Sequence, residues 1–508
     1  MRTASIAATI ASTLNMEQRP LKDAAVITDP ASVSSPPQVT PIPHLPPLAG
    51  ICSFEQAQRV GLSVEACVEW QKDHHYLLVR LHQILTARIT AEPLFELKSA
   101  FSLHAYLCAE HASAIRNRVA EMREPPLGLD DPPDPALELL CDELLTAPTN
   151  VELVLGLYEI AIPGLMDSMT RYLEVTNPLA DAPSVRLTRF CLLELQDMQT
   201  YGRAAVEALV DASARERLVP WTALLRNCVA VAGRTGVSGE QGDLELAPQF
   251  SRTPYQYDPV PKRDSRFHDA YNGGVNPEAF LYDDRFVARD KVLMMFYKRL
   301  REIDVPEMMA GILHQTPGKP WEYYRDMSRQ LWDEARHALM GQVGFVHLGI
   351  DWSRIPVNFT WSLNLNTQLE PWERHAVLFF IEQGLMPRTG KRYEWEVAQA
   401  SGLPLATVFQ DFDWADEVLH AQIGREWYVK EFGDLKEALR YGDRCWSKVM
   451  SHWREYVDQG LTSHRNWWPD LYQEACKNWQ ITPDPAALSF QTTYEATRAD
   501  LKAISASG

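Results

Sequence analysis

Two short stretches of the chain combine residue types that bind transition metals. Each places a glutamate three residues before a histidine, and no other of the 14 histidines has this neighbour. The stretches are DEARH at residues 333–337 and DEVLH at residues 416–420. Residues three apart project from the same side of a helix, so each pair is predicted to offer a carboxylate and an imidazole to one metal ion. Composition alone predicts about one such pair, and the shared preceding aspartate and helical setting strengthen the pattern.

Two further glutamates stand where partner helices would place them. The number of residues from Glu302 to Glu334 is nearly the same as the number from Glu382 to Glu417. Two antiparallel helices that carry ligands at the same height must turn near the midpoint of that spacing. The midpoints are Gly318 in TPGKP and the segment AQASGLP, and both compositions favour a turn. Four helices are therefore predicted to meet at one site.

This set of side chains is hard and rich in oxygen, which suits two iron or manganese ions better than zinc or copper. Four ionised carboxylates in a dry bundle would repel one another, and two divalent cations would offset that repulsion. The predicted metal ligands are Glu302, Glu334, His337, Glu382, Glu417 and His420. The alternative interpretation is a group of solvated surface acids and two hydrogen-bonded core histidines.

Neighbouring residues are predicted to orient the ligands. A metal-bound histidine needs a hydrogen-bond partner for its second ring nitrogen. We expect Asp416 to serve His337 and Asp333 to serve His420, in each case across to the opposite helix. Tyr324, upstream on the DEARH helix, is either a hydrogen-bond donor or radical relay at the site or a core aromatic residue.

Pro306 leaves the ligand of the first helix open between two glutamates. Within a helix the proline ring would crowd the Glu302 carbonyl and remove a backbone hydrogen bond, which kinks the helix. If a helix begins at Pro306 instead, Glu307 becomes the better ligand. Glu302 is favoured over Glu307. The spacing from Glu302 to Glu334 is closer to that of the other pair of predicted ligands than the spacing from Glu307 to Glu334 is.

The whole pattern resembles the ligand set of the ferritin-like di-iron carboxylate superfamily. The likeness covers residues 285–435, and the stretches YYRDMSRQLWDEARHA and DEVLHAQIGREWY are most similar to a branch near the tRNA-modifying hydroxylases. The resemblance implies two iron ions, or a mixed iron and manganese pair, that use O2 to oxidise a small organic substrate. Two alternatives stay open: an iron-handling protein of the ferroxidase type, and a non-catalytic scaffold stabilised by metal.

Helical periodicity fills the segments that must position these residues. We predict an all-α fold of two tandem ferritin-like four-helix bundles. The expected parts are a disordered Pro/Ser-rich leader (1–50), a first bundle (54–230), a linker or surface arm (231–284), the metal-binding bundle (285–435) and a C-terminal helical extension (436–508).

A degenerate copy of the ligand pattern lies upstream. Cys108 and His111 occupy the positions that Glu334 and His337 hold in the second copy. Glu159 and Glu194 precede Glu382 and Glu417 by almost the same number of residues. The residues at the six corresponding positions are Tyr76, Cys108, His111, Glu159, Glu194 and Asp197. One histidine and two glutamates are missing from this copy. We expect the first bundle to bind no metal and to act as a scaffold or in a homodimer.

Composition and charge limit the partners. The 508 residues carry a formal net charge of −18 without a lysine- and arginine-rich block, so neither nucleic acid nor an anionic membrane is expected as a partner. The eight cysteines form no Cys-x-x-Cys pair, and the chain has no Gly-rich dinucleotide motif. An oxygenase would therefore need an external electron donor or reductase. Without a recognisable signal peptide or unbroken apolar span, a soluble cytoplasmic protein is expected.

Overall fold

The structure is a computed structural model, and it describes residues 45–123, 128–232, 246–450 and 453–491. Within these residues every regular element is a helix and none is a strand, which confirms the all-α prediction. Residues 55–508 form one compact unit and residues 1–54 another. The predicted leader lies outside the described residues as far as residue 44, and a short turn, η1 (Leu48–Gly50), follows it.

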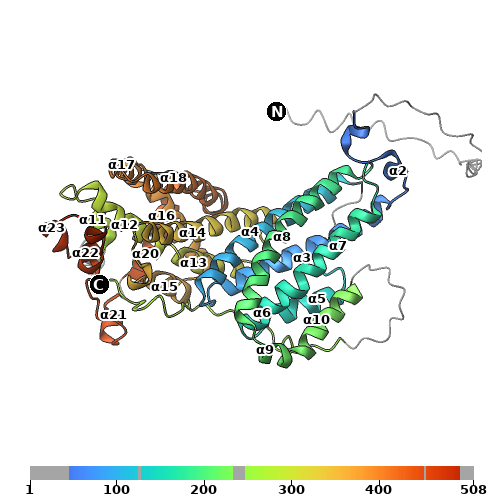
Figure 1. Cartoon of the computed structure of the whole chain (residues 1–508), viewed down its shortest axis with the longest axis horizontal. Helices are drawn as coiled ribbons and strands as arrows, with labels where there is room; N and C mark the ends of the chain where they lie inside the picture. Colours follow the sequence, from blue (N-terminus) through green and yellow to red (C-terminus); the bar gives the residue numbers. More distant parts are fainter. Residues whose placement is uncertain (1–44, 124–127, 233–245, 451–452, 492–508) are drawn as a thin grey trace, which may run out of the picture. The chain divides into compact units, whose positions relative to one another are not determined.

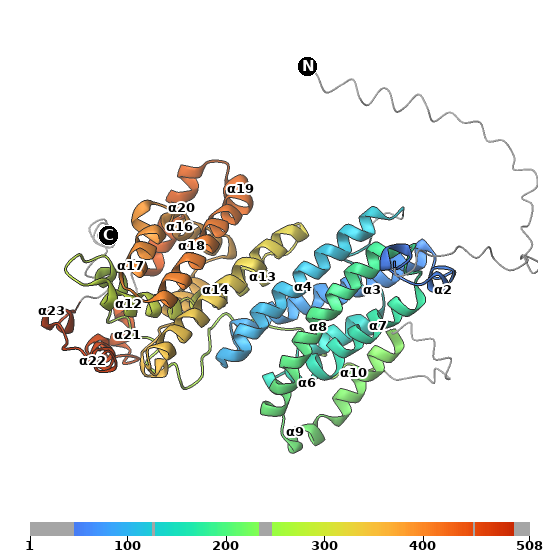
Figure 2. The same ribbon diagram turned by 45° about the horizontal axis from the view of Figure 1, so that its top comes forward.

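Four long helical segments form the core of the first half of the larger unit (Figures 1 and 2). They are α3 (Val64–Ile89), α4 (Phe95–Glu121), the continuous run of α6 (Asn150–Gly156), η2 (Leu157–Ala161) and α7 (Ile162–Val175), and α8 (Ala182–Leu209). Shorter helices flank them: α2 (Phe54–Ala57), α5 (Pro135–Leu145), α9 (Ala212–Arg217) and α10 (Val219–Ala232).

The second half repeats this plan with more interruptions. Its main helices are α12 (Ala288–Arg301), α13 (Asp304–Gln315), α14 (Trp321–His347), α16 (Pro371–Gly384), α17 (Tyr393–Ala400) and α18 (Pro404–Gly424). The shorter elements are α11 (Pro277–Leu281), η3 (Trp352–Arg354), α15 (Thr360–Gln368), η4 (Arg388–Arg392), η5 (Arg425–Val429) and α19 (Lys430–Phe432). Four C-terminal helices follow: α20 (Leu435–Met450), α21 (Trp453–Asp458), α22 (Trp468–Asn478) and α23 (Pro485–Leu488).

The helix bounds of the two halves recur at the offsets found in the sequence. The shift that takes Cys108 to Glu334 also takes both bounds of α4 to the bounds of α14. The shift that takes Glu194 to Glu417 takes the first residue of α8 to the second residue of α18. These two helix pairs thus follow the predicted offsets, while the tandem arrangement of two bundles stays a prediction.

The predicted midpoint turns contain glycines with positive φ. Gly318 has φ of 81° between α13 and α14, and Gly402 has φ of 72° between α17 and α18. This left-handed conformation costs a glycine little, because it has no Cβ. The helix that carries Glu382 does not run unbroken to the second turn, since it ends at Gly384 before Pro387, and η4 separates it from α17.

The described part of the predicted linker is an arm packed on the helices. The Glu143 carboxylate accepts backbone hydrogen bonds from Gln249, Phe250 and Ser251 at 2.7 to 3.0 Å. Farther along, Arg263 is buried against α13. The arm therefore has fixed polar anchors at both of these places.

The two halves share a continuous buried core. α4 packs along α14, and α3 packs along α13 (Figure 2). At this interface Trp321 Nε1 donates to the Ala109 carbonyl at 3.2 Å, and His82 Nε2 lies 2.7 Å from Ser328 Oγ. Buried apolar residues of both halves belong to one connected cluster.

No membrane span was expected from the sequence, but one helical run meets the simple criteria for one. Asn150–Val175 is long and apolar enough to cross a membrane by length and composition, but 61% of its most apolar window is buried inside the protein. A core helix of a soluble protein has these properties, and the fold is consistent with one. The cytoplasmic location stays a prediction.

Candidate metal centre

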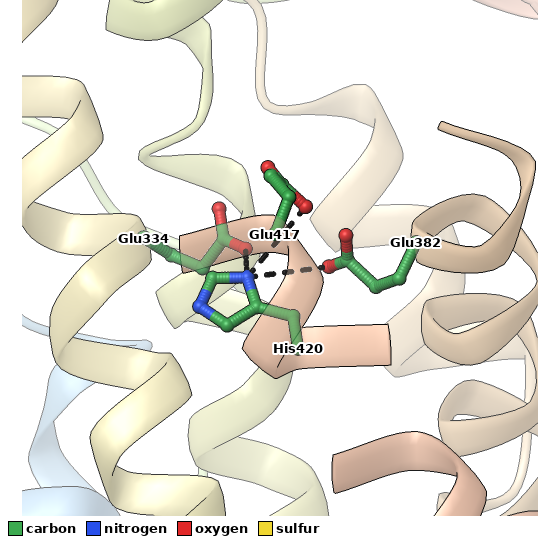
Figure 3. A group of neighbouring side chains, drawn as sticks. All are labelled: Glu334, Glu382, Glu417 and His420. Carbon is green, nitrogen blue, oxygen red and sulfur yellow. Dashed lines mark ion pairs between the residues drawn. The ribbon is translucent and has the colours of Figure 1, made fainter. Parts of the chain in front are cut away.

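The six predicted ligands converge between α12, α14, α16 and α18. They form overlapping groups in which one ligand atom of each residue lies within 4.8 Å of the others, and Figure 3 shows the largest group. The groups are Glu334, Glu382 and Glu417 with His420; Glu302 and Glu334 with His337; and Asp413 and Glu417 with His337. Glu334 and Glu417 each belong to two groups, so the three groups make one continuous cluster.

Both histidines turn the same ring nitrogen toward the carboxylates. His420 Nδ1 lies 3.1 Å from Glu334 Oε1, and His337 Nδ1 lies 3.5 Å from Glu302 Oε2. Each Nδ1 is buried and has no hydrogen-bond partner. An unpartnered Nδ1 aimed into a group of carboxylates is the arrangement of a histidine that binds a cation.

The second nitrogen of each histidine faces an aspartate on the other helix. His337 Nε2 lies 3.0 Å from Asp416 Oδ2, and His420 Nε2 lies 3.4 Å from Asp333 Oδ2. Arg336 holds both aspartates, at 2.7 Å from Asp333 and 2.6 Å from Asp416. The structure thus contains the cross-helix pairs expected from the sequence, and these pairs fix the orientation of both rings.

Several carboxylate oxygens in the cluster also lack partners. The buried Oε2 atoms of Glu302, Glu382 and Glu417 make no hydrogen bond. Buried polar atoms are rarely left unpaired, because each costs its lost hydration. A metal ion that prefers oxygen and imidazole ligands would satisfy these atoms and both histidines, so the side chains present fit iron or manganese.

In the absence of a metal, protons offset part of the negative charge. Burial disfavours a charged His337, but the surrounding carboxylates, led by Asp416, outweigh burial and raise the pKa of His337 to about 10. Burial and the adjacent Glu417 raise the pKa of Glu382 well above its usual value. A metal ion must displace such protons when it binds.

Glu302, rather than Glu307, reaches the cluster. α12 ends at Arg301 and α13 begins at Asp304, so the helix breaks at Glu302 and Pro306 falls within the first turn of α13, where its missing N–H is tolerated. Glu307 faces away and pairs with the buried cations of Lys98 and Arg263. The alternative prediction, that Glu307 is the ligand, is therefore wrong, because Lys98 and Arg263 neutralise the Glu307 carboxylate outside the cluster.

Tyr324 does not belong to the site. Its hydroxyl donates to the Thr316 carbonyl at 2.8 Å, and its ring packs against Trp321. The ten residues to Glu334 are about 15 Å along a helix, which is too far for a direct hydrogen bond. The core-aromatic interpretation holds for this residue.

The upstream copy does not form a comparable cluster among the described residues. His111 Nε2 lies 2.7 Å from Glu194 Oε2, but Glu159 pairs with Arg215 near the surface. Tyr158 is fully buried next to Glu159, and its hydroxyl lies 2.8 Å from His104 Nδ1. The other residues at positions that correspond to the predicted ligands are Tyr76, Cys108 and Asp197, and they belong to no potential metal-binding group.

Sequence reasoning missed Asp413, Arg299 and Lys391. Asp413 lies four residues before Glu417, so it shares that helix face and could have been found by extending the pattern. Arg299 lies three residues before Glu302, and its Nη2 is 2.8 Å from Glu302 Oε1. Burial would raise the pKa of Glu302, but Arg299 and Lys391 outweigh burial and lower it to about 2.

Lys391 comes from the irregular segment η4, which no periodic pattern predicts. Its backbone N–H donates to the Leu385 carbonyl at 3.1 Å. The same carbonyl oxygen would lie 2.2 Å from a Cβ at Gly390, so only glycine fits beside Lys391. This tight loop directs a fully buried ammonium group toward the carboxylates.

A cavity of about 330 Å³ adjoins the cluster at Glu302. Its apolar wall consists of Val305, Trp361, Phe380, Ile381, Leu385 and Trp446. Its polar lining residues include Lys298, Arg301 and Glu278. A space of this kind beside a potential metal ligand is suited to a small molecule with an apolar part.

The fold and the site thus define an all-helical protein with a buried cluster of carboxylates and histidines on four helices. Comparisons of the chain with protein-family models, with curated proteins and with solved structures give no match. Any function must therefore be argued from the geometry of this cluster.

Proposed function

We propose that the protein is a metal-dependent oxidoreductase of the ferritin-like carboxylate type, which uses O2 to oxidise a small organic molecule. The main support is the pair of buried histidines whose Nδ1 atoms lack hydrogen bonds and face carboxylates from other helices. Six residues would hold iron or manganese: Glu302, Glu334, His337, Glu382, Glu417 and His420. Reduced iron or manganese supplies electrons to O2 when bound at such a site.

The other residues of the chain prepare this site. Asp416 and Asp333 accept hydrogen bonds from Nε2 of the two histidines, so each Nδ1 can bind a metal once it has lost its proton. Gln330 Nε2 donates to Glu382 Oε1 at 3.0 Å and orients that carboxylate. Five of the six proposed ligands are buried and the Glu302 side chain is only 15% exposed, so little bulk water reaches these groups.

The cavity beside Glu302 favours an enzyme over a purely structural metal site. Its apolar wall would bind the body of a small organic substrate, and its polar lining residues would orient it. The cysteines are all free and dispersed, so electrons would come from a separate reductase or another external donor. An iron-handling protein or a scaffold would not require this cavity.

The first test is the metal content of the purified protein. Inductively coupled plasma mass spectrometry should find iron or manganese in the wild type and almost none in the His337→Ala, His420→Ala double variant. His375→Ala is the matched control, because it removes another buried imidazole of the same half that lies outside the cluster. Equal metal content in the wild type and the double variant would contradict the proposal.

The second test separates an oxidase or oxygenase from its alternatives. The metal-loaded, reduced protein should consume O2 repeatedly when a chemical reductant and small apolar molecules are supplied. O2 uptake that stops at the stoichiometry of the bound metal, with every molecule tried, would favour a scaffold. A large closed particle in solution would favour an iron-handling role.

A further inference from the structure

The two ends of the metal cluster differ in their surroundings. We call the group around His420, which is Glu334, Glu382, Glu417 and His420, the Glu382 position, and the two groups around His337, which are Glu302, Glu334, Asp413, Glu417 and His337, the Glu302 position. Glu334 and Glu417 are shared by both positions. A pair of equivalent metal sites would need similar charge at both, but the buried side chains of Lys391 and Arg299 both pair with carboxylates of the Glu302 position.

Lys391 places a fixed positive charge at the Glu302 position. Its Nζ lies 2.9 Å from both Asp413 Oδ2 and Glu417 Oε1, and 4.0 Å from Glu302 Oε1. The Lys391 side chain is fully buried. The ammonium group therefore uses the Glu417 oxygen that faces away from His420, whose Nδ1 lies 3.6 Å from the other oxygen of Glu417.

Arg299 adds a second positive charge on the same side. Its guanidinium pairs with Glu302 at 2.8 Å and contacts Asp413 directly. The Arg299 side chain is only 2% exposed, so water screens this charge little. Both cations thus neutralise carboxylates that would otherwise be available to a metal at the Glu302 position.

Lys391 reaches the Glu382 position only through Glu417, the carboxylate shared by both positions. Among the residues that the structure describes, neither a lysine nor an arginine lies within 4.0 Å of the carboxylates of Glu334 or Glu382. Glu382 accepts its hydrogen bond from the neutral amide of Gln330. Three unpartnered ligand atoms belong to this position, Glu382 Oε2, Glu417 Oε2 and His420 Nδ1, whereas Glu302 Oε2 and His337 Nδ1 are the unpartnered ligand atoms of the Glu302 position.

We infer that the two positions are unequal: the Glu382 position binds one divalent transition metal tightly, while Lys391 and Arg299 supply the positive charge at the Glu302 position. This inference rests on the proposed function only in requiring that the cluster bind metal. It refines the pair of ions expected from the four-carboxylate pattern to one tight ion and one weak ion.

Charge arithmetic supports the inequality. Five carboxylates meet here with two fixed cations, so with every carboxylate ionised and both histidines neutral, as metal binding requires, the side chains sum to −3. One divalent ion leaves −1, whereas two divalent ions reverse the sign to +1. The carboxylates are Glu302, Glu334, Glu382, Asp413 and Glu417, and the fixed cations are Arg299 and Lys391. A second ion would also be repelled by the nearby ammonium, and in a buried site this repulsion is strong.

The test is a titration of the metal-free, full-length protein with Mn²⁺. Equilibrium dialysis should show one equivalent bound tightly and a second bound at least about 100-fold more weakly. Electron paramagnetic resonance should then show an isolated Mn²⁺ ion at one equivalent, without the signal of a coupled pair. These wild-type measurements test the inference without depending on the folding of any variant.

Variants assign the inequality to Lys391. Lys391→Met should tighten the second equivalent at least about tenfold and should produce the coupled-pair signal, whereas Lys391→Arg should retain the weak second equivalent. Lys98→Met is the matched control, because that lysine is also buried but pairs with Glu307 outside the cluster. This control variant should still bind the second equivalent of Mn²⁺ weakly.

The possible results separate the two proposals. Two equivalents of equal affinity in the wild type would overturn the inference and leave the proposed metal-dependent function intact. A second equivalent that stays weak in Lys391→Met would also contradict it, provided that the first equivalent still binds. Absence of any tight Mn²⁺ or Fe²⁺ binding would remove both proposals.

Discussion

At the scale of single residues, the aspartates behind the histidines are the most informative targets. Asp416→Asn removes the charge beside His337 Nε2 and keeps the size of the side chain. Loss of such a hydrogen-bonded carboxylate weakens metal binding by about 10- to 100-fold in comparable sites. We expect a loss of this size in Mn²⁺ affinity measured by equilibrium dialysis.

Asp130→Asn is the control for that substitution. Asp130 pairs with Arg116 at 3.0 Å, and its side chain is 70% exposed and does not belong to the cluster. The control variant should bind Mn²⁺ like the wild type. If Asp416→Asn also binds like the wild type, Asp416 does not orient a metal ligand.

The spacing of the sequence was sufficient to find most of the cluster residues. Glu334 with His337, and Glu417 with His420, share helix faces because of the 3.6-residue period, and that period also places the preceding aspartates beside the opposite helix. Lys391 could not be found in this way. Its position depends on a non-helical backbone whose geometry comes from tertiary packing.

At the scale of helices, α12 and α14 approach each other closely beside the site. A Cβ at Gly341 would lie 2.2 Å from the Leu300 backbone nitrogen and 2.6 Å from the Phe296 carbonyl oxygen. Backbone atoms cannot move aside cheaply, so Gly341→Ala must separate the two helices. Gly341 lies one turn after His337, and the separation should therefore also move Glu302 away from that histidine.

We expect Gly341→Ala to lower the free energy of unfolding by about 1 to 3 kcal/mol, as overpacking does. The metal content should fall as well, and urea unfolding with mass spectrometry measures both effects. Gly384→Ala is the control, since a Cβ there meets nothing within 4 Å although Glu382 is nearby. A Gly341→Ala variant as stable as Gly384→Ala would contradict this account of the helix contact.

The two turns predicted from composition, at Gly318 and in AQASGLP, fall where glycines with positive φ separate helices, as Gly318 and Gly402 illustrate. Two breaks were harder to place. The sequence signalled a disturbance near Pro306, but the helix breaks earlier, at Glu302, and this leaves the carboxylate in the cluster. The interruption at η4 arises because Pro387 cannot continue α16 by donating a backbone hydrogen bond.

At the scale of the whole molecule, the two halves are expected to unfold together. Trp321 is 7% exposed where α14 meets α4, and its indole donates to the Ala109 carbonyl. Trp321→Ala should lower the free energy of unfolding by about 3 to 5 kcal/mol. Because the apolar core is continuous across this interface, circular dichroism in urea should show one transition that shifts as a whole.

Trp414→Ala provides the comparison, because Trp414 is only partly buried on α18 and packs mainly against Trp395. Its effect on stability should be smaller. Two separate transitions, of which Trp321→Ala shifts only one, would show that the halves are energetically independent. The chain would then consist of two autonomous domains.

The loop around Gly390 has a consequence for how this protein changes over evolutionary time. Any side chain at that position would push the Leu385 carbonyl away, and the adjacent lysine would be withdrawn with the displaced loop. Descendants that lose the glycine should therefore also lose the selective reason to keep the lysine. Gly390 and Lys391 are therefore expected to be either both kept or both replaced in sequences that descend from this one.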